Sequence, residues 1–344
     1  MSISYRRRAL LATAAVAAPA VWAQGKGAAE RAVFATNWKA QAAHGGFYQA
    51  LIDGTYRKMG LEVEIRPGGP QVNNRPLLPA GRIDFLMAGN LLHSFDNVKQ
   101  GVPVVAVAAI FQKDPQALLA HPGQGYENFA RLADAPVALI AKDGQFTWWQ
   151  WLKVRHGFRD ERLKPYNYNL GPFLANKTAI QQGYSVAEPI YVKKQGGFDP
   201  VVHLLADHGF STYSTLIETR RDTIEKRSAY VQRFVDASII GWYAYLYGDR
   251  RAANAAMLKE NPEMSLEELE ASVLLIKGQG IVDSGEAIER GIGAMSGDRI
   301  RDFYDNMVRA GLYKPAEVDL GKVADPRFVN RRVGLDVKKQ LGGR

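Results

Sequence analysis

The chain has 344 residues, a hydrophobic content of 47% and a formal net charge of +9, which suit a globular protein of about two lobes with a large core. It contains no cysteine, which excludes disulfides, thiolate zinc sites and cysteine nucleophiles. The basic residues are scattered and form no stripe interleaved with aromatics, so the charge does not indicate nucleic-acid binding.

The N-terminal segment has the pattern of an export signal. Three arginines within Tyr5–Arg8 precede an apolar run from Ala9 to Ala20, and Val21–Ala23 offers small residues at a cleavage site. The apolar run is too short to anchor the chain in a bilayer. We expect a signal peptide at residues 1–23, exported by the Sec or the twin-arginine route, and a soluble mature protein in the periplasm.

The first apolar run ends at Ala35 and opens into a polar loop before an amphipathic helix that starts near Phe47 and closes at Gly60. Open α/β sheets place ligands where a strand ends in such a loop. The loop contains three side chains that could contact a ligand, Asn37, Trp38 and His44, and the Gly45-Gly46 pair lets the backbone approach one closely. An isolated tryptophan is often core filler, but the polar neighbours of Trp38 favour a ligand contact.

Four segments of this region carry a resemblance to a known family: Asn37-Trp38, His44–Tyr48, Gly60–Val63 and Leu77–Asp84. They resemble the solute-binding family that contains the thiamine-pyrimidine-precursor binding proteins of ABC importers, which is related to sulfonate, taurine and nitrate binding proteins. The resemblance implies a periplasmic binding protein-like fold of the second type. Such a fold has two lobes, each with a mostly parallel sheet flanked by helices, a ligand in the cleft between them, and ABC permease and ATPase subunits as partners.

Alternating strands and helices continue the pattern of parallel βαβ units. We expect a strand at Leu61–Ile65, a helix at Val72–Ala80 and a buried strand at Asp84–Met87. Gly89 and Asn90 follow this strand, and Asn90 can cap the next helix or contribute to an anion site at its start.

The apolar run Val102–Phe111 predicts a central strand buried on both faces. Gln112 to Pro115 interrupt it, and Gln112 is a further ligand candidate at a strand end. We place the crossing into the second lobe near Leu119–Pro122. The first lobe then comprises residues 30–117 and 210–335, and the second lobe comprises residues 118–209.

Within the second lobe, a strand at Val137–Ala141 leads into a turn and a helix start that hold ligand candidates Gly144, Gln145, Phe146, Thr147 and Trp148. Trp149 and Trp151 follow. Adjacent helical residues point about 100° apart, so at least one of the three indoles should reach the cleft or the surface. The alternative is a core helix with one surface tryptophan.

Leu163–Tyr168 alternates apolar and polar residues and predicts a strand, and Phe173–Gln182 predicts a helix that ends at Gly183. The resemblance implies that the turn after Gly183 faces the cleft, which makes Tyr184, Ser185 and Glu188 candidates. A glutamate before a proline is held extended, so we expect Glu188 to be directed into the cleft, with an ordinary surface charge as the alternative. Helices are predicted for the rest of the chain at 221–247, 250–261, 265–278 and 298–310.

The sequence contains no P-loop, no His-Glu-x-x-His and no Gly-x-Ser-x-Gly motif, and its six histidines lack metal-ligand spacing. Fungal enzymes that make the thiamine pyrimidine share the implied fold but carry a cysteine-rich motif, which is missing here. We therefore expect a monomeric binding protein without catalytic residues, cofactor or metal, which captures a small planar compound for import. Trp38 and Glu188 would hold that ligand from opposite lobes. A small organic anion, a sensing role beside a membrane receptor and a biosynthetic enzyme are the alternatives.

Overall fold

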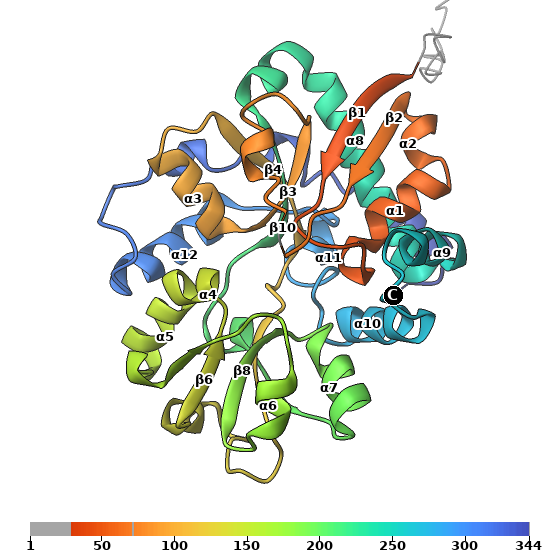
Figure 1. The fold of residues 1–344 in the computed structure, drawn as a ribbon. Helices are drawn as coiled ribbons and strands as arrows, with labels where there is room; N and C mark the ends of the chain where they lie inside the picture. The colour runs from red at the N-terminus through yellow and green to blue at the C-terminus, as the bar shows by residue number, and fades with distance from the viewer. Residues whose placement is uncertain (1–28, 71, 344) are drawn as a thin grey trace, which may run out of the picture.

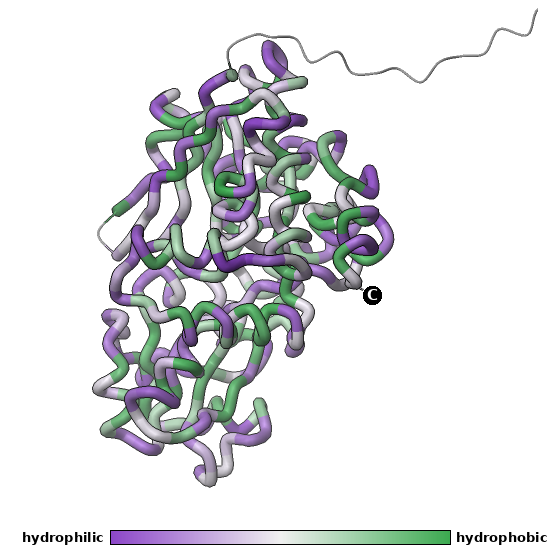
Figure 2. Tube along the Cα trace, turned by 90° about the vertical axis from the view of Figure 1, so that its right-hand side faces the viewer, coloured by the Kyte–Doolittle hydropathy of each residue, from purple (hydrophilic) through white to green (hydrophobic). Residues whose placement is uncertain are grey.

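The computed structural model describes residues 29–70 and 72–343, so the predicted signal peptide lies outside the described residues. The chain forms two five-stranded sheets of mixed direction, each flanked by helices. The two sheets lie in separate lobes, one above the other in Figure 1, and a view turned by 90° shows the same division (Figure 2). This architecture is the expected periplasmic binding protein-like fold.

The first sheet has the strand order β2-β1-β3-β10-β4. Its strands are β1 (Glu30–Ala35), β2 (Leu61–Arg66), β3 (Phe85–Asn90), β4 (Val104–Phe111) and β10 (Ser214–Arg220). β1 pairs in parallel with β2 and β3, whereas β10 returns from the second lobe and pairs antiparallel with β3 and β4. Every residue of β4 is buried, which confirms the predicted burial on both faces and explains its continuous apolar sequence. Its predicted central position is wrong, because β4 is the last strand of the sheet, and its outer side is covered by isolated bridges to Gly293 and Ala324.

The second sheet has the order β7-β6-β8-β5-β9. Its strands are β5 (Gln116–Ala120), β6 (Val137–Ile140), β7 (Leu163–Pro165), β8 (Ala179–Tyr184) and β9 (Val201–Leu204). The predicted crossing near Leu119–Pro122 is wrong, because β5 is buried and hydrogen-bonded antiparallel to both β8 and β9. The chain instead passes between the sheets in the short segment from Phe111 to Gln116, and it returns between Leu204 and Ser214.

Around the first sheet lie α1 (Gly45–Ile52), α2 (Thr55–Lys58), α3 (Leu91–Lys99), α8 (Arg221–Tyr247), α9 (Arg251–Glu260), α10 (Leu266–Gly278), α11 (Ala287–Arg290), α12 (Gly297–Arg309) and α13 (Leu335–Gln340), with 3-10 turns η1 (Ala42–His44), η2 (Arg75–Leu77), η6 (Leu320–Lys322) and η7 (Pro326–Phe328). The second lobe contains α4 (Lys142–Phe146), α5 (Trp148–His156), α6 (Gly171–Ala175) and α7 (Glu188–Gly196), with η3 (Phe129–Asp134), η4 (Asp160–Arg162) and η5 (Leu205–His208). The four predicted C-terminal helices are confirmed within one residue at each end. Within the described residues, no helix combines the length and the hydropathy that a membrane span requires.

Two predicted helices are wrong. Residues 72–80 form only the single turn η2, because Pro76 and Pro79 remove the amide donors that a longer helix would use. The predicted helix Phe173–Gln182 ends at Ala175, and its second half is strand β8, which lies between β5 and β6. A position in the middle of a sheet outweighs the helical propensity of this alanine- and glutamine-containing segment.

Helix α10 joins the two lobes at one side of the cleft. Its N-terminus is fixed by a capping box, in which Ser265 accepts the Glu268 N–H and Glu268 accepts the Ser265 N–H. The buried Ser272 hydroxyl donates to the Val186 carbonyl of the second lobe at 2.6 Å. Just beyond the helix, Gln279 exchanges hydrogen bonds with Ser185. α10 therefore forms a side wall of the cleft that is hydrogen-bonded to the second lobe.

Candidate functional site

A cavity of about 490 Å³ opens between the lobes. The first lobe contributes the loop after β1, with Trp38 and Lys39, and the connection between α9 and α10. The second lobe contributes the loop after β7, with Tyr166 and Tyr168, and one face of α7. The loops that follow β1 and β7 lie at the carboxyl ends of strands, where α/β sheets place ligands.

Aromatic rings from both lobes meet in this cavity. The Trp38 and Tyr168 ring centroids lie 4.9 Å apart with a tilt of 49°, and Tyr166 lies 5.4 Å from Tyr168. Tyr168 has a positive φ of 59°, a left-handed conformation that costs a residue other than glycine free energy and is frequent at functional sites. Its side chain is nevertheless 48% exposed. The strained backbone thus holds a large ring in the opening rather than in the core.

Glu188 is the carboxyl group at the second-lobe side of the cavity. It is the first residue of α7, so the prediction of an extended backbone is wrong. Pro189 follows within the first helical turn, where the missing amide costs no hydrogen bond. The Glu188 carboxylate folds back and accepts the Tyr184 N–H at 2.7 Å. Burial raises the pKa of Glu188 to about 7, although the hydrogen bond from the Tyr184 N–H favours the ionised form.

Gly183 makes the position of Glu188 possible. A Cβ at this glycine would lie 2.9 Å from the Glu188 Cβ, which is closer than real Cβ contacts. The absent side chain therefore leaves the space into which the glutamate folds.

Both lysines that line the cavity are already paired. Lys39 lies 2.6 Å from Glu263, and Lys194 lies 2.9 Å from Glu268. Each pair links the α9–α10 side of the first lobe to another wall of the cavity. Among the described residues, Glu188 has no ion-pair partner, so the lining as a whole is acidic.

Beneath Glu188 lies a further group of acidic side chains. The Asn90 amide donates to the Asp114 carboxylate at 2.7 Å, and burial raises the pKa of Asp114 to about 6. Asn90 also accepts the Leu92 N–H, which confirms its predicted role as a helix cap. Burial and then the carboxylates of Asp114, Asp143 and Glu188 raise the pKa of the Tyr184 phenol. Tyr184 is therefore surrounded by negative rather than positive charge.

The residues around α4 mostly stabilise their own segment. The Gln145 amide donates to the Ile140 carbonyl at 2.8 Å, and the Thr147 hydroxyl donates to the Asp143 carbonyl at 2.7 Å. Gly144 is buried, and a Cβ there would lie 2.7 Å from the Trp148 ring. Phe146 differs from these residues because its side chain is 70% exposed.

The prediction that at least one of Trp148, Trp149 and Trp151 reaches the cleft or the surface is wrong, since all three are buried. Trp149 packs on Phe158 and donates to Asp160, while Trp151 packs on Phe210. Helix α5 is covered by Phe158 and Asp160, which follow it in the chain, and by Phe210 of the segment that returns to the first lobe. A helix covered in this way buries indoles that point in different directions.

Several other predicted ligand residues lie away from the cavity. His44 is fully buried, and burial lowers its pKa to about 3, so it is a neutral core side chain. A Cβ at Gly46 would lie 2.2 Å from Trp242, so the glycine pair allows α1 to pack on α8 rather than a ligand to approach. Gln112 is buried and donates to the Ala109 and Ala294 carbonyls, and the Gly89 N–H donates to His93. Asn37 is exposed at the surface beside Trp38.

Of the predicted ligand residues, Trp38 and Glu188 line the cavity, and Tyr184 lies next to Glu188. Tyr166, Tyr168 and Tyr191 also line the cavity and are not among the predicted ligand residues. The signal was present, because two tyrosines at alternate positions follow the short strand β7, and Tyr191 stands one helical turn after Glu188. Tyr191 also donates its hydroxyl to the Met264 sulfur at 3.2 Å, across the cleft.

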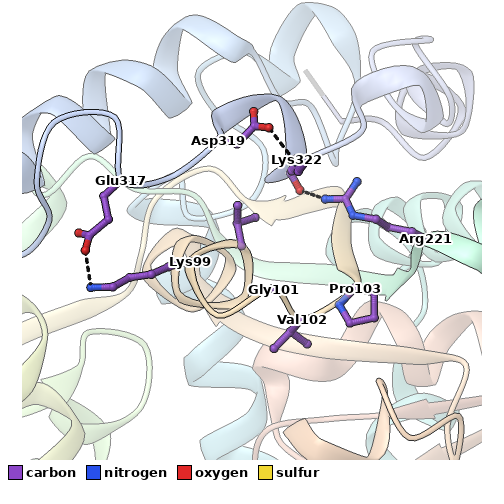
Figure 3. Close-up of a pocket in the computed structure, with 9 residues that line it drawn as sticks. Lys99, Gly101, Val102, Pro103, Arg221, Glu317, Asp319 and Lys322 are labelled. Carbon is purple, nitrogen blue, oxygen red and sulfur yellow. Dashed lines mark hydrogen bonds and ion pairs between the residues drawn. The ribbon is translucent and has the colours of Figure 1, made fainter.

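A second hollow of about 360 Å³ lies on the first lobe beside the start of β4 and the end of β10 (Figure 3). The chain leaves for the second lobe from the opposite end of β4, so this hollow is remote from the cleft. Its cations are already engaged, because Lys99 pairs with Glu317, Lys322 pairs with Asp319, and Arg221 donates to the Lys322 carbonyl. None of the described residues that line it is aromatic, so it is a weaker candidate for a planar ligand than the inter-lobe cavity.

Solved structures with the same fold include transport proteins and an enzyme. The alkanesulfonate-binding protein SsuA from Xanthomonas axonopodis pv. citri, bound to MOPS, is 14% identical, with a TM-score of 0.59 over 86% of this chain and 98% of its own. The periplasmic nitrate-binding protein NrtA from Synechocystis PCC 6803 is 12% identical, with a TM-score of 0.59 over 91% and 88%. The desulfurization enzyme DSZB is 12% identical, with a TM-score of 0.57 over 89% and 99%. At these identities the likeness shows the fold alone.

No curated protein matches the chain in sequence. A family match described as NMT1/THI5 like covers residues 41–264, which is more than half of the chain. The matched range begins three residues after Trp38 and runs through the whole second lobe to Met264, at the side wall of the cavity. The chain therefore belongs to the NMT1/THI5-like family.

Proposed function

We propose that this protein is the solute-binding component of an ABC importer and that it captures a small planar compound in the inter-lobe cavity without converting it. The observation that carries the proposal is the meeting of Trp38, Tyr168 and Glu188 from opposite lobes in one cavity of about 490 Å³. Flat aromatic walls suit a planar ring, and a carboxyl group at one end suits its amino groups.

The comparisons support a transport role over an enzymatic one. Proteins of this fold include the sulfonate- and nitrate-binding proteins named above. The proposal gives this chain permease and ATPase subunits of an importer as partners. DSZB is an enzyme with the same fold. That this protein binds its solute without converting it is therefore part of the proposal. The fold also suits ligand capture by closure of two lobes around a hinge, here the two crossings between the sheets.

The proposal places the mature protein in the periplasm, as a monomer, after cleavage near Ala23. Its basis is the charged and then apolar N-terminal sequence, which ends in small residues. Mass determination of protein recovered from the periplasm tests this part. A product that still begins at Met1 would contradict it.

Within the class of planar solutes, a pyrimidine precursor of thiamine is the proposed ligand, because the chain belongs to the NMT1/THI5-like family. The second candidate is a small organic anion such as a sulfonate or an aromatic carboxylate. The observation that favours it is the sulfonate- and nitrate-binding function in the names of proteins with the same fold. The paired lysines of the cavity argue against it, since they leave no free positive charge among the described lining residues.

Native mass spectrometry of the purified protein tests the proposed function most directly. We expect a bound solute of low mass that is released unchanged on denaturation and rebinds to the empty protein. Chemical conversion of that solute by the protein alone would overturn the proposal in favour of an enzyme. Permease and ATPase genes beside this one would support import, whereas a neighbouring sensor kinase would indicate a sensing role.

A further inference from the structure

The charges around the cavity define the kind of solute that it can hold. Three glutamates and two lysines line it, and both lysines are neutralised by Glu263 and Glu268 at ion-pair distance. The remaining carboxyl group is that of Glu188. One of its oxygens accepts the Tyr184 N–H, so the group is oriented by the backbone and not by a cation. An anion that entered this cavity would find no unpaired cation among the described lining residues.

The aromatic lining also favours a cation over an anion. The faces of Trp38 and of the three cavity tyrosines carry negative electrostatic potential, which attracts cations and repels anions. Carboxylates are the charges that act on these phenols. Burial has the largest effect and raises the pKa of all three phenols. Nearby carboxylates raise it further: Glu188 for Tyr166, Asp143 and Glu188 for Tyr168, and Glu188, Glu268 and Glu263 for Tyr191.

The acidic field extends behind the cavity wall. Asp114 and Asp143 surround Tyr184 together with Glu188, and the nearest donor to Asp114 is the neutral amide of Asn90. Burial makes the Glu188 carboxyl group costly to ionise and raises its pKa to about 7. A bound cation would lower this cost and would gain a charge-assisted hydrogen bond in return.

We propose that the cavity selects a planar organic cation, such as an amidinium or a protonated nitrogen heterocycle, with Glu188 as its counter-charge and the Trp38–Tyr168 pair as its aromatic wall. This inference rests on the proposed function, because it assumes that the cavity holds a solute. It adds a charge preference opposite to that of the anion-binding proteins with the same fold.

The test compares three compounds that share one phenyl ring and differ in charge. Benzamidine is cationic, benzamide is neutral and benzenesulfonate is anionic at pH 8, where Glu188 is ionised. Calorimetric titration of the mature protein should give the tightest binding for benzamidine, by tenfold or more over benzamide, and no binding of benzenesulfonate. Glu188→Gln should weaken benzamidine binding at least tenfold and change benzamide binding less than threefold. Glu62→Gln is the control, because Glu62 is an exposed residue of β2, and it should leave all three affinities unchanged.

Equal or tighter binding of benzamide or benzenesulfonate would overturn the inference, and so would benzamidine binding that Glu188→Gln leaves intact. Failure of all three probes to bind at millimolar concentration would also overturn it, because the cavity is large enough for each of them. In every one of these cases, a solute found by native mass spectrometry would still support the proposed function. The two proposals therefore fail on different results.

Discussion

Replacement of Trp38 by alanine separates a ligand-binding role from a packing role for this indole. Trp38 is only partly buried and contacts Tyr168 across the cleft at a centroid distance of 4.9 Å. A planar ligand that stacks on the indole would gain about 0.5–1.5 kcal/mol from the aromatic contact. Covering about 50 Å² of apolar surface adds roughly 1.3 kcal/mol at about 25 cal/mol per Å². The loss of both, about 1.8–2.8 kcal/mol, corresponds to roughly a 20- to 100-fold increase in Kd.

The same substitution should have a small effect on the empty protein. The lost Trp38–Tyr168 contact contributes about 0.5–1.5 kcal/mol, which lowers the Tm of a chain of this size by at most about 4 °C. A tryptophan in the core would instead cost about 3–5 kcal/mol on truncation to alanine. The two roles therefore predict opposite patterns of affinity and stability.

The assay is calorimetric titration with the tightest-binding of the three phenyl probes, alongside melting curves of the empty protein. Trp38→Phe serves as the matched control, because it keeps a ring of smaller area and should retain most of the affinity. An unchanged Kd for Trp38→Ala together with a large fall in Tm would refute the reasoning. Trp38 would then be core filler.

Three further predictions follow from buried groups. Burial raises the pKa of Glu188 from 4.5 to about 7, so the folded protein binds this proton more tightly than the unfolded chain. The folded protein therefore loses stability as pH rises from 4.5 to about 7. Glu188→Gln should have a higher Tm than wild type at pH 8 and the same Tm near pH 4. Burial lowers the pKa of His44 to about 3, so below pH 6.5 the unfolded chain binds a proton that the folded protein does not. This difference lowers the stability of the folded protein as pH falls from 6.5 to about 3. His44→Leu should make the fall of Tm over this pH range smaller and should leave probe affinity unchanged. Gly183→Ala should displace Glu188 and weaken benzamidine binding tenfold or more, whereas Gly278→Ala, whose Cβ would meet no atom within 4 Å, should not. A steep acid transition that persists in His44→Leu, a constant stability difference for Glu188→Gln at all pH values, or equal affinity of the two glycine variants would contradict the respective argument.

Local sequence determined the elements whose signals lie within one segment. The apolar run of β4 predicted a strand buried on both faces, Asn90 predicted a helix cap, and apolar spacing predicted the C-terminal helices. A helix satisfies most of its backbone hydrogen bonds within one segment, and the burial of a strand on both faces is visible in its own apolar sequence. The motifs near Trp38 also predicted the family and the fold. Each of these features depends on residues that are close together in the chain.

Tertiary structure decided which side chains reach the cleft. The Gly45-Gly46 pair has the flexibility of a ligand loop, but the approach of Trp242 and Tyr245 from α8 makes it a helix-packing site. Segment 179–182 has helical propensity, but pairing with β5 and β6 made it a strand. Trp151 of α5 is buried against Phe210, which belongs to the distant segment that returns to the first lobe.

The sequence alone also does not predict the acidic character of the cavity. Lys39 and Lys194 read as free positive charges along the chain, and their neutralisation depends on Glu263 and Glu268, which are at least 70 residues away in the chain. Whether a charged side chain is available to a ligand depends on its nearest opposite charge in space. For Lys194 that distance is set by α7 lying beside α10, and for Lys39 by the loop after β1 lying beside the connection between α9 and α10; no local pattern encodes either contact.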